Sequence, residues 1–206
     1  MANIESIKDA LCDVRKAHRI IYAYQKRMMG IVRFIGKKLD FPVCVGYKWF
    51  SNEASKKISS STWAWDFIYS YLFEYYLGVK KSPDGAMDYA LSVVQYSDTG
   101  FFDSLQSTRT NLNSFSTEEE SGSKFLFIIE AKPQASPWWW DTKAIINSKE
   151  FASCKHTSSI RHEGDSIIGL YSVPIELFMD EDSAISVLTD FCSFCHENKI
   201  ADLLLY

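Results

Sequence analysis

The sequence contains few cysteines and prolines and no long apolar segment, and each shortage argues against a class of protein. It has five cysteines and five prolines in 206 residues. An odd number of cysteines in a chain of this length argues against a disulfide framework and indicates a reducing environment. No run reaches the roughly 18 apolar residues that a membrane helix needs, and the N-terminal sequence MANIESIKDA lacks the apolar region of a signal peptide. We therefore expect a cytoplasmic protein with no membrane partner.

The motifs of several common enzyme classes are also absent. The sequence contains no glycine-rich phosphate-binding loop, no G-x-G-x-x-G dinucleotide fingerprint and no G-x-S-x-G nucleophile elbow. Its net charge of −4 at pH 7 does not favour a general nucleic-acid-binding protein. We therefore expect neither nucleotide binding nor serine-hydrolase chemistry.

Apolar and aromatic side chains are abundant, as in a globular domain with a substantial core. Hydrophobic residues make up 47% of the chain and aromatic residues 15%. We predict a single α+β domain over residues 1–206. A mostly antiparallel sheet of about five strands is expected in the sheet core 43–173. A long N-terminal helix over 4–39 and a C-terminal helix over 182–198 flank this sheet.

The predicted strands are separated by polar segments. We expect the strands at 43–50, 63–77, 88–95, 124–132 and 167–173. The aromatic content of 63–77 favours a strand, although its Leu and Glu residues also permit a helix. Residues 97–122 are predicted to be a long loop that either contains a short helix near 101–108 or forms a mobile flap. A second short helix is expected at 138–147, followed by a polar loop at 148–165.

The stretch Lys124–Pro133, with the sequence KFLFIIEAKP, is the predicted centre of the sheet. It is apolar on both faces, which is typical of a strand covered on both sides. Glu130 and Lys132 follow on one face, at the end of the strand. These charges are either the solvated exit of the strand or part of a site.

Glu130-Ala131-Lys132 resembles the E-x-K half of the PD-(D/E)XK nuclease motif. The other half of that motif is an acid at the start of the preceding antiparallel strand, where Asp88 and Asp84 lie in this sequence. The resemblance implies a metal-dependent nuclease with Lys132 as its catalytic lysine. Its Mg²⁺ would be held by Glu130 together with Asp88 or Asp84. If the charges are only a strand end, no cofactor is expected.

Residues 4–39 carry the longest helical pattern. Its apolar residues recur at alternating intervals of three and four, so they lie along one face of the helix and form a seam. His18 and Gln25 are the polar members of this seam. The seam comprises Ile4, Ile7, Leu11, Val14, His18, Ile21, Gln25, Met28, Val32, Ile35 and Leu39. A helix of this length is longer than a domain of this size is wide. It is either a core helix bent across the sheet or a helix that overhangs the domain and pairs with another chain.

The middle of this helix and a run of three tryptophans are the predicted partner-binding residues. They are His18, Ile21, Gln25, Met28, Trp138, Trp139 and Trp140. The tryptophans could form an interface anchor, a platform for stacking a ligand or a cover for the sheet. Charge is also uneven along the chain, with nine Lys and Arg against four acids in 1–40 and one Lys against seven acids in 175–206.

Cys192-Ser193-Phe194-Cys195-His196 matches the C-x-x-C-H haem-attachment pattern, and Cys154 with His156 could complete a zinc site. Both cysteines of the motif also follow the helical spacing of the last helix, which favours buried structural thiols.

These observations predict a small accessory or adaptor protein. It would bind a protein partner, or a second copy of itself, through the N-terminal helix and the aromatic surface. The alternative is a divergent Mg²⁺-dependent nuclease of the PD-(D/E)XK kind, and only this alternative implies nucleic acid as a partner.

Overall fold

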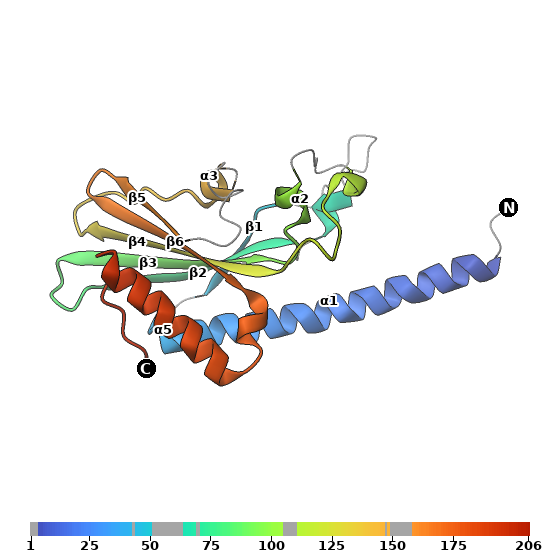
Figure 1. Cartoon of the computed structure of the whole chain (residues 1–206), viewed down its shortest axis with the longest axis horizontal. Helices are drawn as coiled ribbons and strands as arrows, with labels where there is room; N and C mark the ends of the chain where they lie inside the picture. The colour runs from blue at the N-terminus through green and yellow to red at the C-terminus, as the bar shows by residue number, and fades with distance from the viewer. Residues whose placement is uncertain are drawn as a thin grey trace.

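A six-stranded antiparallel sheet forms the middle of the protein in the part of the chain that the structure describes. The structure, a computed structural model, describes residues 4–42, 44–50, 64–68, 71–104, 111–146, 148 and 158–206. The strands are β1 (Val45–Lys48), β2 (Leu72–Lys81), β3 (Met87–Tyr96), β4 (Lys124–Pro133), β5 (Ser159–Glu163) and β6 (Ser166–Pro174). Their order in the sheet is β1-β2-β3-β4-β6-β5 (Figure 1). The predicted α+β class is confirmed.

Helices and short turns connect or flank these strands. The helices are α1 (Ile4–Lys38), α2 (Gly100–Asp103), α3 (Thr142–Ile146) and α5 (Glu181–Glu197). The 3-10 turns are η1 (Ala64–Phe67), η2 (Leu112–Ser114) and η3 (Ile175–Phe178). Among the described residues, no helix combines the length and the apolar character needed to cross a bilayer.

The strand β4 lies inside the sheet, between β3 and β6, as its two apolar faces predict. Phe127 pairs with Val93 of β3 on one side and with Tyr171 of β6 on the other. Phe127 and Ile128, which point to opposite faces, are both completely buried. A strand covered on both faces needs a layer of other elements on each side of the sheet.

One layer consists of α5 and the C-terminal half of α1, which lie on the same side of the sheet (Figure 1). Val32 and Ile35 of α1 and Leu188 and Phe191 of α5 belong to the same buried cluster as Phe127. The ring centres of Phe127 and Phe191 are 4.8 Å apart. The apolar faces of both helices are therefore buried against the odd-numbered side chains of β4.

The opposite face carries α3 and a group of aromatic side chains. Ile145 and Ile146 of α3 pack with Leu126 and Ile128 of β4. Near the other end of the sheet, the aromatic rings form a continuous network of edge, tilted and stacked contacts. This network contains Phe50, Trp65, Tyr71, Phe101 and Phe115.

The two halves of α1 have different environments, because the C-terminal half is a core helix and the N-terminal half overhangs the domain. From Met28 onward the seam is buried against the sheet, and Met28 itself is only 2% exposed. The N-terminal half extends away from the sheet (Figure 1), and Leu11 is 52% exposed. Gln25 lies at the change, where its side-chain amide donates to the hydroxyl of Tyr75 at 2.5 Å.

Local signals end α1 and begin α5. After α1, the N–H of Phe41 donates to the carbonyl of Gly36 at 2.8 Å, while Asp40 takes a left-handed conformation with φ of 57°. The carboxylate of Asp180 caps α5 by accepting from the N–H of Ser183 at 2.8 Å. These two ends fix where the helices leave the core.

Several predicted boundaries are wrong. The loop predicted at 148–165 contains β5, which begins at Ser159. The stretch 63–77 is split, because η1 precedes a strand that begins only at Leu72. The second short helix begins at Thr142, four residues later than expected, so the tryptophans lie in the segment before it.

Candidate functional site

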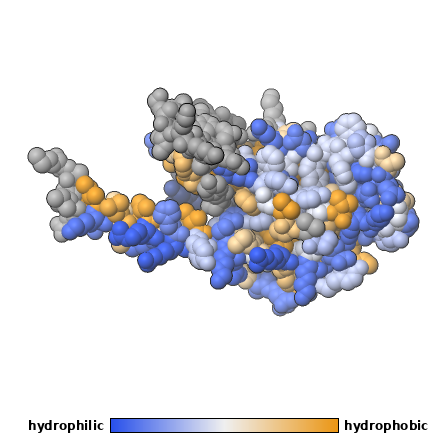
Figure 2. Space-filling view, turned by 180° about the vertical axis from the view of Figure 1, so that it is seen from behind, coloured by the Kyte–Doolittle hydropathy of each residue, from blue (hydrophilic) through white to orange (hydrophobic). Residues whose placement is uncertain are grey.

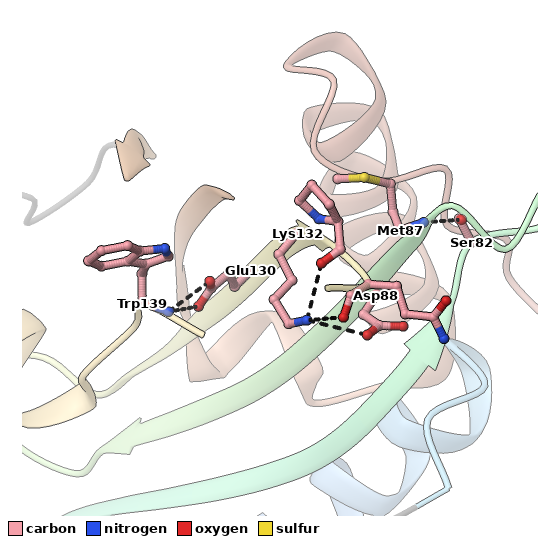
Figure 3. Close-up of polar contacts among 8 residues, drawn as sticks. Ser82, Met87, Asp88, Glu130, Lys132 and Trp139 are labelled. Carbon is pink, nitrogen blue, oxygen red and sulfur yellow. Dashed lines mark hydrogen bonds and ion pairs between the residues drawn. The ribbon is translucent and has the colours of Figure 1, made fainter. Parts of the chain in front are cut away.

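Lys132, from the predicted acid–lysine group, is buried and has several oxygen partners. Its ammonium nitrogen lies 3.4 Å from a carboxylate oxygen of Asp88, which faces it across β3 and β4. It also donates to the backbone carbonyls of Pro133 at 3.2 Å and Gln134 at 3.3 Å (Figure 3). The same nitrogen lies 4.5 Å from the ring centre of Trp138. These contacts compensate the charge of a lysine that is 3% exposed.

Glu130 is completely buried, and its carboxylate is directed toward Trp139 (Figure 3). One oxygen accepts from the N–H of Trp139 at 2.9 Å, and the other accepts from Trp139 at 3.1 Å and from Trp140 at 2.8 Å. The tryptophan segment is outside any strand or helix, so its buried N–H groups need an acceptor from elsewhere. Glu130 therefore anchors this segment to the sheet with charge-assisted hydrogen bonds.

Asp84 lies in the turn between β2 and β3, where it has a structural contact of its own. Its carboxylate accepts from the hydroxyl of Ser82 at 2.5 Å and from the N–H of Ala86 at 3.1 Å. The hydrogen bond from Ser82, followed by that from Ala86, holds the pKa of Asp84 below its usual value. Such contacts are typical of an Asx turn.

The structure therefore brings Asp88 and Lys132 together as an ion pair, while Glu130 and Asp84 have other partners. Within the described ranges, no three or more His, Cys, Asp and Glu side chains lie where they could hold a metal ion. To bind Mg²⁺, Glu130 would have to release the N–H groups of Trp139 and Trp140. Its present hydrogen bonds are those of an anchoring residue.

A second buried carboxylate, Glu74, lies on the same face of the sheet and was not predicted as a site. It is 3% exposed. Its Oε2 accepts from the indole N–H of Trp49 at 2.5 Å, and its Oε1 accepts from the hydroxyls of Ser92 at 2.5 Å and Thr142 at 3.0 Å. The sequence marks Glu74 only as one of the two charges in the aromatic stretch 63–77.

Glu74 lines a pocket of about 560 Å³ between β1, β2 and the tryptophan segment. The walls are mainly aromatic, and the polar groups that do not belong to aromatic side chains are two carboxylates and the hydroxyl of Thr142. The lining residues are Tyr47, Trp49, Glu74, Tyr76, Ala90, Trp138, Trp140, Asp141 and Thr142. A largely apolar pocket of this volume with a few polar groups is typical of small-ligand sites.

The aromatic rings meet at different angles around this pocket. Tyr47 and Trp49 lie 6.3 Å apart at an interplanar angle of 36°, and Tyr76 and Trp140 lie 6.1 Å apart at 72°. Burial raises the pKa of the Tyr76 phenol, and the carboxylate of Glu74 adds to the shift, so the phenol stays neutral at physiological pH.

The three tryptophans do not form one surface. Trp138 and Trp140 line the pocket, whereas the Trp139 ring lies over the turn between β5 and β6. A Cβ atom added to Gly164 would lie 3.5 Å from that ring. Trp139 is nevertheless 51% exposed.

The N-terminal half of α1 presents a row of exposed apolar side chains. Figure 2 shows hydrophobic residues along one edge of the projecting helix and hydrophilic residues along the other. The exposed apolar residues of the seam are Ile7 (48%), Leu11 (52%), Val14 (50%) and Ile21 (43%). His18 is also exposed. Of the residues predicted to bind a partner, Met28 instead lies in the core, and half-buried Gln25 bonds to the sheet.

Comparison with known proteins identifies the family. A family model designated PM0109 matches residues 4–200. The chain belongs to the PM0109 family. No curated protein and no solved structure matches it. The match extends from the projecting helix through α5 and includes the pocket residues.

In this PM0109 chain, the cysteines of the last helix have the surroundings of structural thiols. Cys195 is completely buried in the core, and burial raises the pKa of its thiol far above the usual value. His196 is exposed and lies 2.7 Å from a carboxylate oxygen of Asp202. Cys154 and His156, the other half of the zinc hypothesis, lie outside the described residues.

Proposed function

We propose that this protein is a non-enzymatic accessory or adaptor subunit that assembles through the projecting half of α1. The observation that carries the proposal is the exposed apolar seam, which continues the buried seam of the same helix. Ile7, Leu11 and Val14 each remain about half exposed. Burying a complete Leu or Ile side chain contributes about 1.5–3 kcal/mol, so covering this row with another helix is strongly favourable.

The spacing of the seam identifies a helix as the binding element. Intervals of three and four residues bring side chains to one face, where they fit the holes of a facing helix. A flat sheet would not follow such a narrow row. His18 in the middle of the row is the kind of polar residue that selects a register at some cost in stability.

Charge along the projecting helix favours a second copy of the chain as the occupant. Residues 6–13 contain two acids and one lysine, while residues 15–27 contain five Lys and Arg and no acid. Two such helices crossing antiparallel near Val14 place the acidic part of each against the basic part of the other. The same arrangement brings Ile7 beside Ile21 and Leu11 beside His18.

We predict that Ile21→Asp converts the assembled protein into a folded monomer. An unpaired carboxylate in the seam would lose its hydration on assembly, so the dissociation constant should rise by about a hundredfold, corresponding to roughly 3 kcal/mol. Light scattering measures the mass, which we expect to be twice the 23.6 kDa of one chain in the wild type. Circular dichroism checks that the variant is folded.

Ile20→Asp is the matched control, because Ile20 is the adjacent isoleucine, is 67% exposed and lies off the seam. This variant should assemble like the wild type. Leu11→Asp, farther from the sheet, should dissociate the assembly without affecting the core. A wild-type monomer with no co-purifying protein would overturn the proposal, and a complex with a different helical protein would replace the second copy as occupant.

The alternative function, a Mg²⁺-dependent nuclease, makes the opposite prediction about Lys132. We expect no cleavage of single- or double-stranded DNA or RNA with Mg²⁺, in the wild type or in Lys132→Ala. The substitution should instead lower the free energy of unfolding by about 1–3 kcal/mol, because half-buried Asp88 and two carbonyls lose their partner. Metal-dependent cleavage that disappears in Lys132→Ala would favour the nuclease.

A further inference from the structure

The pocket around Glu74 contains a buried carboxylate, and none of the described residues that line it is cationic. Indole N–H groups only donate, so the contact from Trp49 Nε1 requires an acceptor oxygen on Glu74. Among the described residues that line the pocket, two are carboxylates and none is Lys, Arg or His. Buried charges in proteins are usually paired, because taking a carboxylate out of water is costly.

The lysine that contacts a lining ring of the pocket has its own partners. Lys132 lies against Trp138, which is on the rim of the pocket, but its ammonium bonds to Asp88 and to two backbone carbonyls. This contact also shows that the face of one lining ring already accepts a cation in the folded protein. Lys132 therefore does not balance Glu74, and no Lys, Arg or His among the described lining residues does.

The walls of the pocket determine what kind of cation fits. Rings of Tyr47, Trp49, Tyr76 and Trp140 surround it, and a cation is attracted to a ring face within about 6 Å of its centre. A Mg²⁺ or Ca²⁺ ion needs six or more oxygen ligands, which this aromatic lining does not supply. An alkylated ammonium group is weakly hydrated, so its methyl groups can contact the rings while its charge faces Glu74.

We propose that the pocket binds a quaternary ammonium group, with Glu74 as the counter-ion and Trp49, Tyr76 and Trp140 as the aromatic cage. The proposal is independent of assembly through α1. Two sources present this group: a choline-type small molecule and a trimethylated lysine side chain of a protein. The pocket chemistry is the same for both.

The first experiment compares choline chloride with 3,3-dimethylbutan-1-ol, a neutral molecule of nearly the same shape. Quenching of tryptophan fluorescence measures binding, since three tryptophans line the pocket. Choline should bind saturably and at least about tenfold more tightly than the alcohol, because only choline interacts with the carboxylate and the ring quadrupoles as a cation. Equal binding of choline and the alcohol would overturn the proposal. So would a failure of both choline and a peptide that carries a trimethylated lysine to bind saturably.

The second experiment uses variants of the tryptophan segment. Trp140→Leu removes a ring of the cage, whereas Trp139→Leu removes the neighbouring ring that lies over Gly164. Both retain the N–H groups that bond Glu130. Trp140→Leu should weaken choline binding by roughly tenfold and Trp139→Leu should leave it unchanged. Equal losses in the two variants would contradict the cage.

Glu74→Gln tests the counter-ion while keeping an amide oxygen that accepts from Trp49. We expect choline binding to weaken by at least about tenfold and binding of the alcohol to change little. Thermal unfolding checks that the variant is folded, and Tyr76→Leu provides a second test if it is not. A trimethyllysine peptide and its unmodified counterpart form the last comparison: tighter binding of the trimethylated peptide than of choline would identify a protein side chain as the source.

Discussion

Replacing Ile128 with Asp is expected to unfold the protein. Ile128 is completely buried on β4, in the cluster that also contains Leu126, Ile145 and Leu170. The substitution removes an apolar side chain and places a carboxylate, completely buried, in a cluster of apolar side chains. The combined cost exceeds about 5 kcal/mol, which is comparable to the whole stability of many domains. Circular dichroism and chemical denaturation would show the loss of the cooperative transition.

Ile160→Asp is the matched control, because it makes the same change on a strand at the edge of the same sheet. Ile160 of β5 is 37% exposed, so a carboxylate there remains in contact with water. We expect the free energy of unfolding to fall by no more than about 1 kcal/mol. If Ile128→Asp kept a wild-type melting temperature, β4 would not be the buried centre of the sheet.

The central strand was predictable because its own residues contain the information. A run such as KFLFII is apolar on both faces, and only a strand covered on both sides accommodates it. Strand β5 was missed for the converse reason. It lies at the edge, and its sequence SIRHE places polar and charged groups at most positions, as edge strands often do. A short polar strand and a polar loop have similar sequences.

The helix pattern predicted α1 but not the change in its environment. The spacing of the seam is the same before and after Gln25, so it shows an apolar face without showing what covers it. The same spacing predicts that Met28 binds a partner, whereas Met28 is buried on its own sheet. The position at which the sheet ends depends on strands that come much later in the chain.

The pocket could not be predicted because its parts are distant in sequence. Glu74 receives hydrogen bonds from Trp49, Ser92 and Thr142, which come from three different segments. No local pattern links them. The sequence contains the motif Glu130-Ala131-Lys132. The same residue pattern can occur at a strand end whose charges bond within the protein and at a catalytic site. Only the contacts of each carboxylate distinguish an anchor from a site.

Those contacts lead to the second large effect, which is expected for Glu130→Ala. Trp139 and Trp140 would each lose a charged acceptor for a backbone N–H at 2.8–2.9 Å. Hydrogen bonds to charged groups contribute about 1.5–3 kcal/mol each, so the free energy of unfolding should fall by about 3 kcal/mol or more. Urea denaturation measures this change.

Glu130→Gln separates anchoring from metal binding, because it keeps one oxygen acceptor and replaces the other with an amide donor. Its stability should lie between those of the wild type and Glu130→Ala, since one N–H group would face a donor. In both variants Trp140 is less firmly held. Choline binding in the neighbouring pocket should therefore weaken in Glu130→Gln and weaken further in Glu130→Ala. A carboxylate kept for Mg²⁺ would behave differently, because its removal would abolish cleavage while leaving the unfolding transition in place. If Glu130→Ala had the same denaturation midpoint as the wild type, the anchoring role would be contradicted and metal binding by Glu130 would be favoured.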